Sequence, residues 1–109
     1  MKIISKIKNQ ISKYPILIYM KGSPQFPSCG FSSRAVQILS SFKVKFFHVD
    51  ILKNLDIRNE LPKFSNWPTF PQIWISGKLI GGSDILFELY KNGKLQEIIK
   101  KALKGSKNK

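Results

Sequence analysis

Apolar residues recur at helical spacing near the start of the chain. They are four isoleucines separated by lysines and other polar residues: Ile3, Ile4, Ile7 and Ile11. This pattern predicts an amphipathic helix over residues 2–13, and Pro15 marks its end. The run from Pro15 to Met20 is then continuously apolar, which is typical of a strand buried on both faces.

The segment from Lys21 to Ser28 contains one glycine, two prolines and two serines, so it is predicted to be a loop. Cys29 follows directly. A second amphipathic helix comes after the cysteine, with these residues on one face: Ala35, Val36, Leu39 and Phe42. Lys45 to Val49 reads as a second strand. Strand, loop, helix and strand in this order form a βαβ unit, which places Cys29 at the carboxyl end of a strand.

A third helix is predicted to begin at Asn54 as its N-cap and to end or kink at Pro62. A hairpin follows, because Gln72–Ile75 and Lys78–Ile80 are joined by the tight-turn pair Ser76-Gly77.

A fourth helix is predicted to start with Ser83 or Asp84 as its cap and to stop at Gly93. Its inward residues are expected to be Ile85, Leu86 and Leu89. A last helix has an apolar face made of Leu95, Ile98, Ile99 and Leu103. The fold class predicted is α/β, a mixed four-stranded sheet flanked by helices.

The chain of 109 residues is long enough for one core but not for two. We therefore expect a single domain over residues 1–104 and a basic flexible tail over 105–109. A signal peptide needs an apolar stretch of about 7 to 15 residues and a membrane span about 20. The longest early apolar run, Ile16 to Met20, is shorter than either, so no membrane association is predicted.

A single cysteine excludes an internal disulfide, and a reducing, cytoplasmic location fits best. The net charge of +13 raises the question of nucleic-acid binding. The lysines, however, are scattered from Lys2 to Lys109 and arginine is scarce. Specific nucleic-acid binding is therefore not predicted, and weak attraction to acidic partners is the more credible consequence of the charge.

Cys29 lies between a glycine and proline loop and a helix, where free backbone N–H groups and the helix dipole stabilise a thiolate. Lys21 adds a cation nearby. Both effects lower the pKa of a thiol. A small buried apolar side chain is the alternative interpretation of Cys29, and position favours the functional one.

Three blocks of the sequence resemble the monothiol glutaredoxin family, of the bacterial single-domain type. The first is Cys29 to Ser32 (Cys-Gly-Phe-Ser), preceded by Lys21 to Pro24 (Lys-Gly-Ser-Pro). The second is Asn66 to Gln72 (Asn-Trp-Pro-Thr-Phe-Pro-Gln), and the third is Gly81 to Asp84 (Gly-Gly-Ser-Asp). The resemblance implies a thioredoxin-like fold, with Pro71 in a cis peptide bond facing the thiol.

The same resemblance implies a glutathione site. Lys21 and Arg58 match positions that hold the glycine carboxylate, and the Phe70 backbone pairs with the cysteine of the tripeptide. The N–H groups of Gly82 and Ser83 receive the γ-glutamyl carboxylate, and Asp84 accepts from the amine. From the residues alone, Arg58 is a solvated helix charge and Asp84 an N-cap.

Three further residues carry weaker signals. Trp67 before a turn is assigned to packing rather than to a stacking surface. His48, the single histidine, would be an isolated metal ligand, so no metal role is predicted for it. Phe31 is expected to shield the sulfur, and core packing would give the same pattern.

Ser32 stands where a two-cysteine glutaredoxin has its resolving thiol, and a hydroxyl cannot resolve a disulfide. Ser83 replaces another cysteine that many relatives have. Iron–sulfur clusters usually need four thiolates. The resemblance therefore implies a homodimer bridged by a 2Fe-2S cluster on two Cys29 thiolates and two glutathione sulfurs.

Such a cluster suits transfer to recipient apoproteins, and the resemblance adds a BolA-type protein as a further partner. The alternative is a glutathione-dependent thiol oxidoreductase in which Cys29 is the catalytic nucleophile and removes glutathione from proteins.

Overall fold

The computed structural model describes the backbone of residues 2–106 and side chains through Lys104. The helices are α1 (Lys2–Lys13), α2 (Gly30–Ser41), α3 (Leu55–Ser65), α4 (Ser83–Lys91) and α5 (Lys94–Ser106). The strands are β1 (Ile16–Met20), β2 (Phe47–Asp50), β3 (Gln72–Ile75) and β4 (Lys78–Gly81). Helix α5 runs through Ser106, and residues 107–109 of the predicted tail lie outside the described residues.

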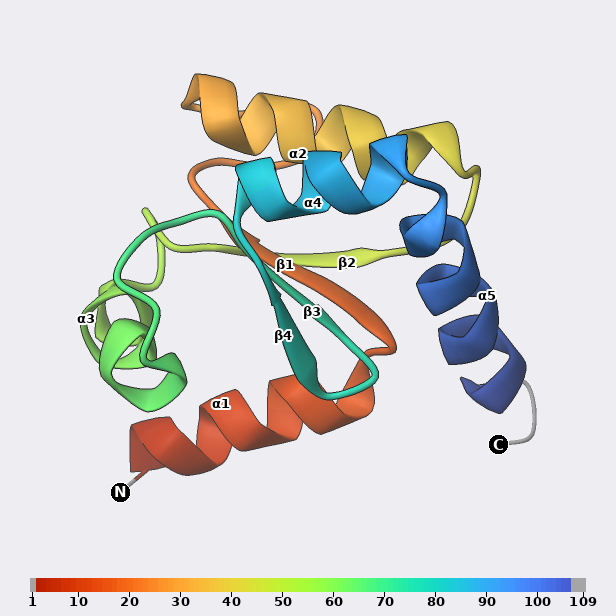
Figure 1. The fold of residues 1–109 in the computed structure, drawn as a ribbon. Coiled ribbons are helices and arrows are strands. Elements are labelled where there is room, and N and C mark those ends of the chain that lie inside the picture. Colours follow the sequence, from red (N-terminus) through yellow and green to blue (C-terminus); the bar gives the residue numbers. More distant parts are fainter. Residues whose placement is uncertain (1, 107–109) are drawn as a thin grey trace.

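The four strands form one mixed sheet in the order β2-β1-β3-β4. Strand β1 is parallel to β2 and antiparallel to β3, and β3 pairs antiparallel with β4. Helices α2, α4 and α5 cover one face of this sheet, and α1 and α3 cover the other (Figure 1). The predicted α/β class with a mixed four-stranded sheet flanked by helices is confirmed.

Strand β1 is the centre of both hydrophobic cores. Every one of its five side chains is fully buried, and the side chains alternate between the two faces. Ile16, Ile18 and Met20 belong to the cluster under α2, α4 and α5. Leu17 and Tyr19 belong to the cluster under α1 and α3. The expectation of a strand buried on both faces is therefore confirmed.

The second strand starts later than predicted, at Phe47 instead of Lys45. The pairing register places Phe47 opposite Leu17. Continued backwards, the same register would place Lys45 opposite Pro15, which has no N–H to donate. The ladder therefore begins only after that position.

An end or a kink of α3 was expected at Pro62; the helix continues to Ser65, so the first of these alternatives is wrong. Proline removes only one backbone donor from the helix, whereas Leu61 is fully buried and Phe64 packs against the same cluster. Asn54 precedes the helix, but its side chain makes no capping hydrogen bond; its amide donates to the Asp50 carbonyl at 2.8 Å instead.

Candidate functional site

Cys29 is the N-cap residue of α2 and lies beyond the carboxyl end of β1, as the βαβ pattern predicts. Its backbone is extended, with φ −154° and ψ 152°. The Cys29 sulfur accepts the Ser32 backbone N–H at 3.3 Å. The thiol thus satisfies one of the N–H groups that the first turn of a helix leaves free.

The Ser32 hydroxyl connects this thiol to the end of β1. Ser32 is fully buried, and its oxygen lies 3.4 Å from the Cys29 sulfur. The same oxygen accepts the backbone N–H of Lys21 at 3.3 Å. Because Lys21 directly follows β1, the buried hydroxyl fixes the sulfur relative to the sheet.

Five effects act on the pKa of the Cys29 thiol. Burial, the largest single effect, raises it. The Ser32 hydroxyl, the backbone N–H groups of Ser32 and Phe31 and the charge of Lys21 all lower it, and together they outweigh the burial. The net pKa of Cys29 is below its ordinary value, as the sequence predicts.

Hydrogen bonds to Asp50 and to Lys21 fix the loop that precedes Cys29. Gly22 has φ +89°, and its N–H donates to the Asp50 carboxylate at 3.0 Å. The Ser28 N–H donates to the Lys21 carbonyl at 2.9 Å. A Cβ atom on Gly22 would lie 2.4 Å from the Phe26 carbonyl oxygen, so only glycine fits.

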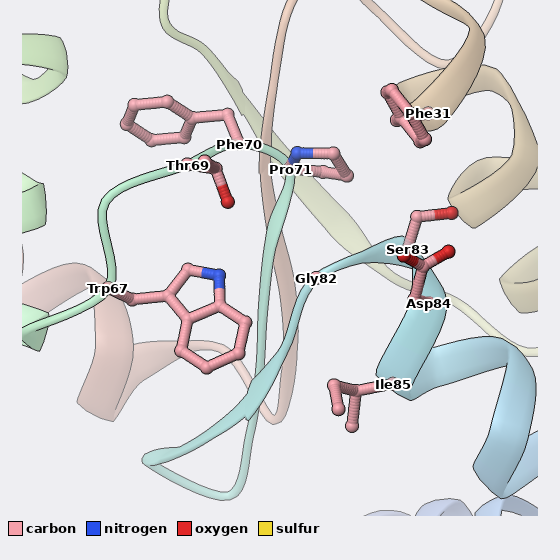
Figure 2. Close-up of a pocket in the computed structure, with 9 residues that line it drawn as sticks. All are labelled: Phe31, Trp67, Thr69, Phe70, Pro71, Gly82, Ser83, Asp84 and Ile85. Atoms are coloured by element: carbon pink, nitrogen blue, oxygen red, sulfur yellow. The ribbon is translucent and has the colours of Figure 1, made fainter.

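Two adjoining pockets include residues close to Cys29 in the chain, since Phe31 lines the first and Lys21 the second. We call them together the binding groove. The first has a volume of about 280 Å³ and lies between the start of α4 and the segment before β3 (Figure 2). Its walls are formed by Phe31, Trp67, Thr69, Phe70, Pro71, Gly82, Ser83, Asp84 and Ile85. The Phe70–Pro71 peptide bond is cis, as the resemblance implies.

The second pocket of the groove has a volume of about 370 Å³. Lys21 and Arg58 contribute two cations to it, and Asn59, Pro62 and Pro68 complete the far side. Thr69 and Phe70 line both pockets, so the two pockets adjoin at these residues. One end of the groove is cationic, and the other ends at the first turn of α4.

Six of the seven predicted site residues line this groove: Lys21, Arg58, Phe70, Gly82, Ser83 and Asp84. Cys29 lines neither pocket, but Phe31, two residues later, forms part of a wall. Phe31 is 60% exposed, which excludes core packing as its role. Residues from five separated parts of the chain are thereby brought together.

The glutaredoxin family model matches residues 16–80, which include the thiol, the cis-proline and the hairpin up to Ile80. The chain belongs to the glutaredoxin family. It is 60% identical over 100 residues to glutaredoxin 4 of Haemophilus ducreyi, covering 92% of this chain and 94% of the relative. It is also 60% identical to glutaredoxin 4 of Escherichia coli K12 over 97 residues, or 89% and 84% of the two chains.

Solved structures agree with this assignment. The solution structure of reduced poplar apo GrxS14 is 41% identical and superposes with a TM-score of 0.82, covering 94% of this chain and 98% of that one. The thioredoxin-like fold implied by the resemblance is therefore confirmed for this glutaredoxin.

Ile85 was predicted to face the core, and this is wrong. It is 42% exposed and lines the first pocket, whereas Leu86 is fully buried. Adjacent helical residues differ by about 100° in direction, so both cannot face the core fully. The buried residues of α4 are Ser83 and Leu86, which are three positions apart and therefore share one face of the helix.

Trp67 and Thr69 belong to the groove but were not predicted as site residues. Trp67 was assigned to packing, and its indole ring is indeed partly buried. Its Nε1–H has no hydrogen-bond partner among the described residues, and neither does the Ser83 hydroxyl. Their place in the second sequence block is the signal that could have identified Trp67 and Thr69.

The predicted capping roles of Ser83 and Asp84 are wrong, because the N-cap of α4 is Gly82 and no side chain caps it. The cap lies one residue before Ser83, and the Leu86 N–H donates to the Gly82 carbonyl at 3.0 Å. Asp84 is exposed, and its carboxylate lies 3.7 Å from the Arg34 guanidinium. Arg34 in turn stacks on Phe87, with 4.0 Å between its Cζ atom and the ring centre.

Within residues 2–104, no three histidine, cysteine or acidic side chains come together to hold a metal ion. His48 is exposed on β2. The described helices also include none that is long and apolar enough to cross a membrane. The chain thus offers a soft metal one ligand, the partly exposed Cys29 sulfur.

Proposed function

We propose that this protein is a monothiol glutaredoxin that binds glutathione in the binding groove and carries a 2Fe-2S cluster as cargo. The observation that carries the proposal is the isolation of Cys29. It is a partly exposed thiol with a lowered pKa beside a groove, and its neighbour at the resolving position is a buried serine.

The chemistry of glutathione matches the two ends of the groove. Lys21 and Arg58 would hold the glycine carboxylate, since two cations suit one carboxylate. The N–H groups of Gly82 and Ser83 at the start of α4 would receive the γ-glutamyl carboxylate, where the helix dipole favours an anion. The tripeptide would cross the groove along the backbone of Phe70.

Asp84 would bind the glutathione amine. In the free protein its carboxylate lies near Arg34. At 3.7 Å between two exposed groups this ion pair is weak, so an incoming amine can replace it at little cost. Ile85 and Phe31 would cover the apolar part of the same pocket.

Cys29 fits a cluster as one ligand of four. Its sulfur is accessible, and the surrounding N–H groups favour the thiolate, the form that binds iron. One chain leaves three positions to be filled. A second chain and the sulfur of a bound glutathione on each chain would supply them, which makes the holo form a homodimer.

The alternative function is glutathione-dependent reduction of protein mixed disulfides by Cys29. The lowered pKa of Cys29 favours it, because a thiolate is also the better nucleophile. Ser32 cannot resolve the mixed disulfide, so a second glutathione would have to do so. The family resemblance adds recipient apoproteins and a BolA-type protein as proposed partners. The single thiol favours a cytoplasmic location.

Anaerobic reconstitution with ferrous iron, sulfide and glutathione tests the proposal. We expect a visible charge-transfer spectrum together with a shift from monomer to dimer in gel filtration, and both are lost in Cys29→Ser. A colourless monomer that reduces a glutathione mixed disulfide would instead establish the enzyme.

A further inference from the structure

Two adjoining cavities lie at the end of the sheet opposite Cys29, and we call them the distal groove. The larger, about 710 Å³, has an apolar floor that includes Phe42, Val44 and Ile99. The smaller, about 380 Å³, is lined by Tyr14, Pro15 and Phe47 among others. Leu103 lines both cavities, so they adjoin at this residue.

The distal groove is separated from the thiol by the length of the parallel strands. Pro15 directly precedes β1, whereas Lys21 directly follows it. Six residue steps at about 3.3 Å each put roughly 20 Å between Pro15 and Lys21. Figure 1 shows the start of α2 and helix α5 on opposite sides of the molecule. A partner in the distal groove therefore leaves Cys29 and the binding groove free.

Four lysines surround the apolar floor: Lys13, Lys45, Lys100 and Lys104. Two of these lysines lie over an aromatic pair. The rings of this pair, Tyr14 and Phe47, stack with 4.2 Å between their centres. The Lys13 ammonium lies 5.5 Å from the Tyr14 centroid, and the Lys45 ammonium lies 5.4 Å from that of Phe47.

These four charges have no acidic partner within the part of the chain that the structure describes. The ion pairs found there are Lys6–Asp56, Arg34–Asp84 and Lys63–Glu60. Neither cavity has an acidic residue in its lining, and Glu97 on α5 lines neither. The distal groove thus combines apolar surface with uncompensated positive charge.

We infer that the distal groove is a docking site for an acidic amphipathic segment of a partner protein. Its apolar side chains would cover Phe42, Val44 and Leu103, and its carboxylates would pair with the lysines. Two other occupants are disfavoured by like charge. A second copy of the chain carries a net charge of +13, and the segment 105–109 of the same chain contains two lysines and no acidic residue. A nucleic acid backbone would leave the apolar floor uncovered.

The test uses a fluorescent synthetic peptide with leucines at helical spacing on one face and glutamates on the other. Fluorescence anisotropy measures its binding to the wild-type protein and to Lys45→Glu/Lys100→Glu. We expect the double variant to bind about tenfold more weakly. The matched control is Lys8→Glu/Lys53→Glu, which has the same net charge, alters exposed lysines outside both cavities, and is expected to change the affinity less than about twofold.

An equal loss of affinity in the two double variants would show only general attraction and would overturn the inference. So would equally tight binding of a scrambled peptide of the same composition. Tighter binding of oligo-dT or of anionic phospholipid vesicles, with the same dependence on Lys45 and Lys100, would assign the groove to a different partner class and would also overturn it. Unchanged glutathione affinity in the Lys45/Lys100 variant is expected, which separates this test from that of the proposed function.

Discussion

The buried Ser32 hydroxyl lies 3.4 Å from the Cys29 sulfur and 3.3 Å from the Lys21 backbone nitrogen, so one side chain joins the reactive thiol to the end of the central strand. The Lys21 N–H donates to the hydroxyl oxygen. The hydroxyl proton is thereby free to point at the sulfur, where it stabilises negative charge.

Ser32→Ala should raise the pKa of Cys29, because it removes the hydroxyl contribution and keeps the backbone N–H. The rate of alkylation by iodoacetamide, measured against pH on the metal-free protein, gives this pKa. The midpoint should move to higher pH in the variant. Ser33→Ala is the control, since no hydrogen bond of the Ser33 side chain is found among the described residues; an equal shift there would exclude the specific role of Ser32.

Gly22→Ala should destabilise the fold by about 2 kcal/mol or more, because it combines a positive φ with a clash against backbone. The added Cβ would lie 2.4 Å from the Phe26 oxygen and 2.9 Å from the Ser28 nitrogen. Gly30→Ala is the matched control, since nothing lies within 4 Å of its Cβ position. Urea denaturation of both variants measures the difference, and equal stability would contradict the structure of this loop.

Asp50→Ala should cost about 1 to 3 kcal/mol, because two backbone donors lose their acceptor. The Asp50 oxygen Oδ1 accepts the N–H of Gly22 at 3.0 Å and that of Leu52 at 2.9 Å. Asp50→Asn retains an oxygen there and should lose less. Hydrogen exchange should accelerate at these two amides in the alanine variant, and protection equal to wild type would refute the anchoring role.

The sequence predicts the place of Cys29 but not the whole wall of the binding groove. Local patterns suffice for the thiol, because strand, loop and helix follow one another directly. The orientation of Ile85 depends on where α4 starts, and the sequence offers Ser83 and Asp84 as caps, whereas the N-cap is Gly82. The Arg34–Asp84 pair likewise joins two helices and leaves no local signal.

Pro62 shows the same limit for the fold. The residue before a proline avoids the helical region, which predicts an end or a kink at Pro62. The burial of Leu61 and the packing of Phe64 explain why α3 continues. Lys21 and Arg58 are the opposite case, since the family resemblance predicts them and the structure brings them to one pocket.

Lys21→Ala and Arg58→Ala should each weaken glutathione binding about tenfold, as expected for the loss of a charge-assisted hydrogen bond. Isothermal titration calorimetry measures the affinity. Lys53→Ala, an exposed lysine outside both pockets, serves as the control for net charge. Full affinity in both pocket variants would place the glycine carboxylate elsewhere.

The stoichiometry of the holo protein tests the central claim most directly. Native mass spectrometry of the anaerobically reconstituted protein should give a dimer with one cluster and about one glutathione per chain, in keeping with four sulfur ligands. Cys29→Ser should remain a monomer without iron. A wild-type monomer that holds a cluster, or a cluster dimer without glutathione, would contradict the account.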